Sequence, residues 1–400
     1  MSGAVRSLFL ISLFSWVTLL GCSSSGAGNG NGGDSGSGSN TSGSSSNSLI
    51  ITPTIAADIA WDPASQRIYF STPGLTAGGS TANTVNAFDP VTSKVTLSVS
   101  ALTEPGPVSV SANGKYLYVG IKDLNLVQRL TLPSLKADLQ IPLGTSPLNG
   151  PYYAWDLRAS PTSDETVAIA RTDKIVSSFV NGGIGIYDGA TPRSAFLCGE
   201  DFTKGCKGVS DIWVQFAWNG TGDAIVARNG TSPSAMAYWP LDGSGFLDYT
   251  GPPIFNTLGG GNEIVNSLHP DPSTGLVYLD NGGIVDPTGL KSLGQFTGIA
   301  NQYSFSPVMT LDVKRGKAYF LVDTKDAINK PDIYAIEVFD LNTYALLATV
   351  PVSSDPLPGM PKKIIRWGTN GLAFTMLPTM LGTIEESQPS AIYTITSDSF

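Results

Sequence analysis

The sequence predicts an all-β fold over residues 49–400, a seven-bladed β-propeller, and three observations lead to this prediction. The region consists of many short runs of β-branched and aromatic residues, and Gly, Pro, Asn or Asp ends most of them. Few stretches have the period of an amphipathic helix. A unit of two strands and a tight polar turn also recurs along the chain, which is typical of repeat architectures.

The repeated unit begins with two strands joined by a turn that carries Asp, Asn, Gly or Pro, the residues that tight hairpins require. Its seven instances are residues 59–70, 108–119, 157–170, 216–227, 267–279, 311–322 and 364–376. A third strand follows in each unit, at residues 84–90, 126–134, 183–189, 235–243, 282–289, 334–343 and 391–398. A fourth, more variable segment, such as residues 94–101 or 345–352, leads to the next unit.

The spacing of the units favours a propeller over other β folds. Equivalent positions of the second strands are 41 to 58 residues apart, and four-stranded blades recur at about 40–50 residues. A β-helix has a shorter period, and a β-sandwich shows no such self-similarity. The units resemble the YVTN-type seven-bladed propellers of bacterial surface and periplasmic proteins, most closely at residues 111–119 and 339–352. The resemblance implies an architecture but no activity, because propellers host many unrelated functions.

The two ends of the repeat region predict how the ring closes. Residues 49–55 are apolar and β-prone, and they precede the first strand of the first unit with no partner nearby in sequence. The seventh unit ends after its third strand, at Phe400. We expect residues 49–55 to be the missing strand of the seventh blade, because this pairing covers strand edges that would otherwise promote aggregation.

The composition excludes some classes of protein. The chain has 400 residues, of which 41% are hydrophobic and 14% charged, so it can bury a large core and is not a disordered protein. Its net charge is −9, and no run of basic residues is longer than a pair such as Lys362 and Lys363. A protein that binds duplex nucleic acid needs basic patches to displace counterions, so we expect no nucleic acid partner.

The N-terminus predicts export. Arg6 precedes the uncharged residues 7–20, a stretch with the length of a signal-peptide core and shorter than the roughly 20 residues that span a bilayer. Residues 19–22, Leu-Leu-Gly-Cys, then resemble the lipobox of bacterial lipoproteins. The resemblance implies a signal peptide at residues 1–21 and a diacylglycerol and acyl modification on Cys22, the only bound group we expect. An ordinary secretory signal with a chance cysteine is the alternative.

The resemblance also implies a location. Ser23 follows the cysteine in place of the aspartate associated with inner-membrane retention, which implies an outer-membrane lipoprotein, periplasmic or exposed at the cell surface. Residues 23–48 are almost entirely Ser, Gly and Asn with one charge, Asp34, and cannot bury apolar surface. We therefore expect residues 22–48 to be a lipidated cysteine and a flexible tether, with a root-mean-square reach of about 28 Å.

Only two cysteines follow Cys22, and they lie eight positions apart, at Cys198 and Cys206. In an exported protein this spacing favours a local disulfide. Free thiols and a metal site are the alternatives, and no histidine lies nearby in sequence to support a metal site.

The sequence offers no residue that we expect to be catalytic and no metal site. His269 is the only histidine, and the Pro-Asp-Pro that follows it indicates a turn. No Gly-x-Ser-x-Gly motif supplies a nucleophile. Residues 259–261 are Gly-Gly-Gly without the Gly-Lys of a phosphate-binding loop. Asp242, Ser244 and Asp248 do not have the spacing of a calcium loop.

The candidate ligand-binding residues are polar side chains near the starts of the innermost strands, because these strands line a propeller's central channel. They are Asp58, Asp156, Arg158, Asp211, Gln215, Asn262, Glu263 and Arg366. They either bind a ligand at the mouth of the channel or only cap strand ends and solvate loops. Five tryptophans near the same strands, Trp61, Trp155, Trp213, Trp218 and Trp367, are expected to pack between blades rather than to form a stacking platform.

These observations together predict a lipid-anchored, monomeric propeller that acts as a binding or interaction module at the bacterial envelope. Its partners are the membrane, through the lipid anchor, and another envelope protein, a peptide or a glycan. The alternative is a propeller enzyme of lactonase-like or quinoprotein dehydrogenase-like type, with its site at the channel mouth. A cluster of three or four of the candidate residues at metal-coordinating distance would favour the enzyme.

Overall fold

The computed structural model of this chain divides into two units, Met1–Ser44 and Ser45–Phe400. The described residues all belong to the second unit and are 47–74, 82–101, 103–146, 150–173, 182–199, 206–207, 213–229, 235–248, 254–255, 267–289, 291–299, 307–324, 333–355, 357, 359–377 and 390–400. Cys22 and the predicted signal peptide and lipobox lie outside them. No helix among the described residues is long and apolar enough to cross a membrane.

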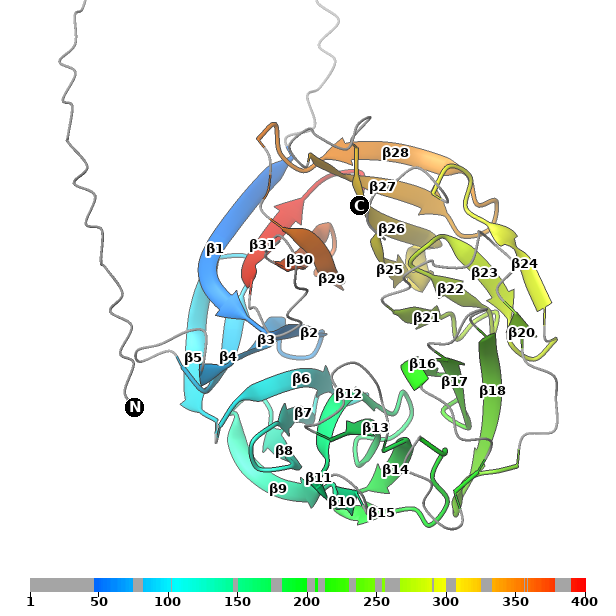
Figure 1. Ribbon diagram of the computed structural model, residues 1–400. Helices are drawn as coiled ribbons and strands as arrows, with labels where there is room; N and C mark the ends of the chain where they lie inside the picture. The colour runs from blue at the N-terminus through cyan, green and yellow to red at the C-terminus, as the bar shows by residue number, and fades with distance from the viewer. Residues whose placement is uncertain are drawn as a thin grey trace, which may run out of the picture. The chain divides into compact units, whose positions relative to one another are not determined.

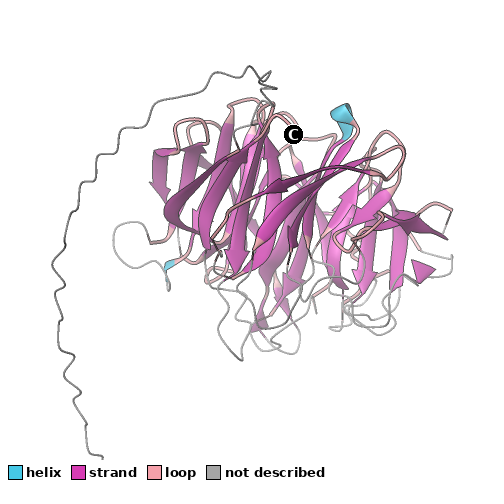
Figure 2. Ribbon diagram, turned by 90° about the horizontal axis from the view of Figure 1, so that it is seen from above, coloured by secondary structure: helices cyan, strands magenta, loops and turns pink. Residues whose placement is uncertain are grey.

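Seven antiparallel sheets stand around a central axis, which confirms the predicted all-β propeller with seven blades (Figure 1). Helical structure is almost absent, as the view in Figure 2 shows, and the short 3-10 helix η2 (Val313–Arg315) is one of the few turns of helix. The first strand of each blade is innermost and the fourth is outermost.

The blades are numbered in chain order from the first inner strand. Blade 1 contains β2 (Asp58–Asp62), β3 (Arg67–Thr72), β4 (Thr84–Asp89) and β5 (Lys94–Ser100). Blade 2 contains β6 (Pro105–Val110), β7 (Tyr116–Ile121), β8 (Leu126–Thr131) and β9 (Lys136–Pro142). Blade 3 contains β12 (Tyr153–Ala159), β13 (Thr166–Thr172), β14 (Ile184–Asp188) and β15 (Thr191–Pro192). The hairpin β10 (Thr145–Ser146) and β11 (Gly150–Pro151) lies between blades 2 and 3 in the sequence.

The other four blades follow the same order. Blade 4 contains β16 (Trp213–Trp218), β17 (Ala224–Asn229), β18 (Ala235–Asp242), β19 (Gly245–Phe246) and β20 (Ile254–Phe255), and blade 5 contains β21 (Leu268–Pro270), β22 (Val277–Leu279), β23 (Gly283–Asp286) and β24 (Lys291–Gln295). Blade 6 contains β25 (Val308–Asp312), β26 (Lys317–Asp323), β27 (Tyr334–Asp340) and β28 (Leu346–Pro351). Blade 7 contains β29 (Met360–Trp367), β30 (Gly371–Leu377), β31 (Ser390–Thr396) and β1 (Ser48–Ala56).

The ring closes as predicted, because β1 is the outermost strand of blade 7. It pairs antiparallel with β31, with Leu49 opposite Ile395 and Ile51 opposite Tyr393. Leu49 also packs against the core cluster of blades 6 and 7. The first described strand and the last strand of the chain therefore belong to one sheet.

The burial pattern explains why the strands read differently in the sequence. Second strands such as β7 and β13 are buried along their whole length, because neighbouring blades cover both of their faces. They therefore appear as continuous apolar runs. Outer strands such as β5 expose most of their residues and are more polar. The core consists of apolar clusters between adjacent blades, for example the cluster that joins blade 7 to blade 1 through Ile59, Phe88 and Ile392.

Turns between third and fourth strands share an aspartate that caps the turn. The Oδ1 atoms of Asp89, Asp242, Asp286 and Asp340 each accept a hydrogen bond from the backbone N–H two residues later, at 2.7–3.1 Å. Such Asx turns favour aspartate at the end of a strand, which accounts for the Asp that recurs there in the sequence. Asp242 uses its carboxylate in this turn, and Asp248 pairs with Lys207 at 2.9 Å.

The predicted disulfide is present, between Cys198 and Cys206. The N–H of Cys198 also donates to the carbonyl of Lys207 at 2.9 Å. The disulfide follows β15, the two-residue outer strand of blade 3.

Candidate functional site

The pairing registers of the inner strands define which residues share a level in the channel. Each inner strand contains a buried apolar residue opposite a buried residue of the second strand, such as Ile59 opposite Phe70 and Leu157 opposite Ile169. The residues just before these positions form what we call the first channel ring: Asp58, Pro107, Asp156, Gln215, Ser267, Val308 and Lys363. Two residues further, on the same side of each strand, is the second channel ring: Ala60, Ser109, Arg158, Ala217, His269, Thr310 and Ile365. Val308 of the first ring and Ala217 of the second occupy these register positions but are buried in core clusters between blades.

Asp58, in blade 1, connects three blades. Its Oδ1 accepts a hydrogen bond from Lys363 Nζ of blade 7 at 2.7 Å, and its Oδ2 accepts one from the N–H of Val108 of blade 2 at 2.9 Å. Burial alone raises the pKa of Asp58, but the charge and hydrogen bond of Lys363 and the hydrogen bond of Val108 outweigh burial, so the pKa lies below its ordinary value. An ionised Asp58 is therefore part of the connection between the first and last blades.

Arg158 extends from blade 3 towards blade 5. Its Nε donates to Asp156 Oδ2 at 3.0 Å, and its Nη2 donates to Ser267 Oγ at 3.2 Å. Burial alone lowers the pKa of Arg158, but the charges of Asp156 and Asp58, the hydrogen bond to Asp156 and the charge of Asp280 raise it above its ordinary value. The side chain is nevertheless 32% exposed, and its Nη1 makes no hydrogen bond to any described residue.

His269 is not the turn residue that the sequence indicated, because it lies in β21 and belongs to the second channel ring. Its Nε2 is 2.8 Å from Asp280 Oδ1. The same oxygen accepts a hydrogen bond from the N–H of Met309 of blade 6 at 2.9 Å. Asp280 is 1% exposed, and its Oδ2 has no partner among the described residues. A buried carboxylate oxygen without a partner is costly in most structures and often marks a functional position.

The structure brings together only part of the predicted set. Asp58, Asp156 and Gln215 occupy the first channel ring and Arg158 the second, although Gln215 mainly holds Arg228, at 2.9 Å. Arg366 lies near the other end of β29, where it contacts Asp312 of blade 6 at 3.2 Å and backbone carbonyls of its own hairpin. Three of the predicted residues are outside the described ranges: Asp211, Asn262 and Glu263.

Several channel residues have a structural role that explains their polarity. Asp58, Ser109 and Asp280 each accept a hydrogen bond from a backbone N–H of the next blade's inner strand, from Val108, Ala159 and Met309. The bonds to Asp58 and Ser109 hold adjacent inner strands in register, and the bond to Asp280 joins the end of β22 to the inner strand of blade 6. The strand-capping role considered from the sequence therefore applies to Asp58, whereas Arg158 contacts a blade beyond its neighbour.

The sequence missed three residues of this cluster: Lys363, Ser267 and Asp280. Lys363 was visible only as part of a basic pair. Asp280 directly follows the buried strand β22, at a position where other blades carry residues as different as Leu321, Thr375 and Arg228. Because this position is polar in some blades and apolar in others, a comparison of the repeats gives no signal for Asp280.

The tryptophans mostly pack between blades, as predicted. Trp218 is buried and its Nε1 donates to the carbonyl of Arg158 at 2.8 Å, which fixes the backbone at the second channel ring. Trp155 packs against the cluster of blades 3 and 4. Trp61 and Trp367 meet at the junction of blades 1 and 7, with ring centroids 6.4 Å apart. The side chain of Trp213 is outside the described residues.

The cluster contains charged and polar groups but no arrangement suited to a metal. Within the described ranges, no three His, Cys, Asp and Glu side chains lie close enough together to hold an ion. Two of its cations, Lys363 and Arg158, are each held by a carboxylate, from Asp58 and Asp156. A partly exposed guanidinium in a fixed position is suited to an anionic or hydrogen-bond-accepting group.

Comparisons with known proteins support the architecture. Hydrazine synthase of Kuenenia stuttgartiensis is similar at 13% identity with a TM-score of 0.55, over 86% of this chain and 96% of that chain. The β-propeller domain of Myceliophteria thermophila Cps50 (Swd1) is similar at 13% identity with a TM-score of 0.57, over 88% of this chain and 99% of that chain. The chain is a seven-bladed β-propeller. No protein family and no curated protein matches its sequence, and likeness at 13% identity shows the fold alone.

Proposed function

We propose that this propeller is a lipid-anchored binding module of the bacterial envelope and that it contacts its ligand through Arg158 in the central channel. The observation that carries the proposal is the state of this guanidinium, which Asp156 and Ser267 hold in place while 32% of the side chain stays exposed. Preorganised arginine binds carboxylates with little loss of side-chain entropy. The ligand is a peptide, a glycan or a segment of an envelope protein that presents a carboxylate to the channel.

The experiment compares binding of envelope-derived peptides that carry a free carboxylate with binding of their amidated forms, by isothermal titration calorimetry. Arg158→Met should weaken binding of the free acids about tenfold or more and should not affect the amides, because a charge-assisted hydrogen bond contributes about 1.5–3 kcal/mol. The control is Arg315→Met, an arginine beyond the end of β25 that is 40% exposed. Equal affinity of wild type and Arg158→Met for the acids would contradict the proposal.

The lipid anchor is tested separately. Cys22→Ser should abolish palmitate labelling and shift the protein from the membrane to the soluble fraction. Unchanged membrane association would argue for an exported protein without this anchor.

One observation favours the alternative, a lactonase-like hydrolase. The Nε2 of His269 is paired with a buried carboxylate at 2.8 Å, and such pairs orient histidine bases. Hydrolysis of lactones or esters that His269→Ala abolishes, while the melting temperature is unchanged, would support this function. Absence of hydrolysis across a panel of both substrates would leave binding as the function.

A further inference from the structure

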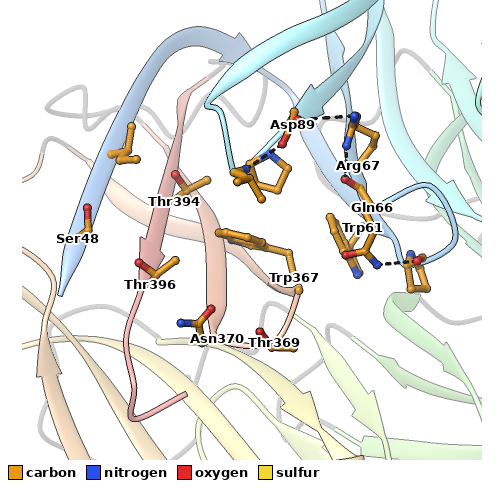
Figure 3. Close-up of a pocket in the computed structure, with 15 residues that line it drawn as sticks. Ser48, Trp61, Gln66, Arg67, Asp89, Trp367, Thr369, Asn370, Thr394 and Thr396 are labelled. Atoms are coloured by element: carbon orange, nitrogen blue, oxygen red, sulfur yellow. Dashed lines mark hydrogen bonds and ion pairs between the residues drawn. The ribbon is translucent and has the colours of Figure 1, made fainter. Parts of the chain in front are cut away.

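A groove lies at the junction of blades 1 and 7, at the face where the inner strands end (Figure 3). Its volume is about 820 Å³, within the range of about 300–1,000 Å³ that is typical of small-molecule sites. Its walls include Trp61, Trp367, Val91, Asn370, Thr394 and Thr396. The first channel ring lies at the other end of the inner strands, so the groove is separate from the channel site.

Two indoles form the aromatic part of the groove. Trp61, near the end of β2, is half-buried, and Trp367, at the end of β29, is 7% exposed. Their ring centroids are 6.4 Å apart and their planes are inclined by 53°. This separation leaves no room for a third ring between them, so a ligand ring has to lie against the side of the pair that faces the groove.

Hydroxyl and amide groups surround the indoles. Figure 3 shows Ser48 on β1, Thr394 and Thr396 on β31, and Asn370 in the turn after β29 around the same space. Most of them can both donate and accept hydrogen bonds. They come from both ends of the chain, because β1 and β31 are paired in blade 7.

Two polar atoms of the groove walls are buried without a hydrogen-bond partner among the described residues. They are Oγ1 of Thr394, a residue that is 2% exposed, and Nε1 of Trp367. Buried polar atoms are satisfied in most structures, but both atoms expose almost no surface, so a ligand in the groove reaches them only after the wall side chains shift.

The groove carries no net charge. Its charged side chains are Arg67 and Asp89, and their closest atoms, Arg67 Nη2 and Asp89 Oδ2, are 3.6 Å apart. A paired arginine and aspartate attract neither an anion nor a cation strongly, but both can form hydrogen bonds to a neutral hydroxylated ligand.

We infer that this groove binds a neutral oligosaccharide of about two to three pyranose rings. The apolar C–H face of a sugar ring matches an indole face, and its hydroxyls match the threonines, the asparagine and the Arg67–Asp89 pair. A phosphorylated or acidic ligand would find no unpaired cation here. A peptide would use the free outer edge of β1, whereas the two indoles are on the inner strands β2 and β29.

The test titrates the whole chain with maltotriose, cellotriose and chitotriose, by calorimetry and by tryptophan fluorescence. Saturable binding of at least one of them is expected. Val91→Lys should weaken it about tenfold or more, because Val91 is 76% exposed at the groove and a long charged side chain there obstructs the ligand. Trp61→Ala should weaken it about 30-fold, as expected for a central aromatic contact. Arg158→Met should change nothing, which separates this inference from the channel proposal.

The matched control is Asn342→Lys. Asn342 occupies the same turn position in blade 6 that Val91 occupies in blade 1, since both N–H groups bond the Oδ1 of the preceding aspartate, at 2.9 and 3.0 Å. It should leave binding unchanged. Val91→Lys decides the question even if Trp61→Ala destabilises the fold, because Val91 is exposed. Absence of saturable binding at millimolar sugar, binding that Val91→Lys does not weaken, or binding of a blocked peptide alone would overturn the inference.

Discussion

Blades 3 and 7 both lack an ordinary outer strand directly after their third strand, and they compensate in different ways. Blade 7 takes β1 from the other end of the chain, a strand of nine residues that pairs along most of its length with β31. Blade 3 has only the two-residue β15, and the disulfide of Cys198 and Cys206 follows it. Main-chain pairing from a distant segment and a local covalent bond therefore secure different parts of one ring.

The largest expected effect is the loss of β1. Deleting residues 49–55 exposes the edge of β31 and the apolar cluster that Leu49 covers. Most of the roughly 5–15 kcal/mol that stabilises a typical domain should be lost. The loss should appear as aggregation or as the disappearance of the cooperative melting transition in circular dichroism.

Deleting residues 23–46 is the control for this truncation. It leaves β1 intact, since β1 begins at Ser48. The melting temperature should be that of the whole chain. Equal stability of the two truncations would show that β1 does not hold the ring closed.

The next effect is the loss of the disulfide. Cys198→Ser with Cys206→Ser should lower the free energy of unfolding by about 2.5 kcal/mol, the loop-closure contribution for cysteines eight positions apart. Chemical denaturation of the oxidised wild type and the double variant measures it. A reducing agent should lower the stability of the wild type and leave the double variant unchanged. If a reducing agent does not change the free energy of unfolding of the wild type, the disulfide does not stabilise blade 3.

A smaller effect is expected at the junction of blades 1 and 7. Asp58→Asn removes the carboxylate that Lys363 contacts and should cost about 2 kcal/mol at pH 7. Because the pKa of Asp58 is lowered in the folded protein, its contribution is complete above the ordinary aspartate value of about 4 and is lost as the pH falls through the folded value.

Urea denaturation between about pH 7 and pH 3 measures this dependence. The difference in stability between wild type and Asp58→Asn should shrink as the solution becomes acidic. Asp398→Asn, at an exposed aspartate, is the control and should match the wild type throughout. A difference that stays constant with pH would mean that the ionised carboxylate is not what joins the blades.

The smallest effect concerns outer-strand side chains. Ile51 on β1 is 50% exposed and Leu347 on β28 is 53% exposed. Ile51→Thr and Leu347→Thr should each change the free energy of unfolding by less than about 0.5 kcal/mol. A large cost for Ile51→Thr alone would show that β1 acts through this side chain rather than through its main-chain pairing.

The fold was predictable because its signals are local. Each blade begins with a hairpin whose turn residues and buried second strand can be read within a dozen residues, and residues 49–55 and the two cysteines were visible as segments without another role. The short outer strands β15, β19 and β20 were not predictable, because two-residue strands have no periodicity.

The channel cluster was predictable only in part, because its members meet across blades. Asp58 and Lys363 lie almost at opposite ends of the repeat region, and Arg158 reaches Ser267 two blades away. Their contact depends on the register of one blade against the next, which no local pattern encodes. His269 was assigned to a turn because the prolines after it hid the three-residue strand β21.

The pairing of β1 with β31 also sets an order of events in time. A chain is synthesised with its N-terminal end first, so Ser48–Ala56 is available long before Ser390–Thr396. Six blades can form their sheets from strands that are neighbours in sequence, whereas β1 can pair only after the last strand has been made. Until then the apolar β1 has no partner strand to pair with. The ring can therefore close only after the last strand of the repeat region has been synthesised.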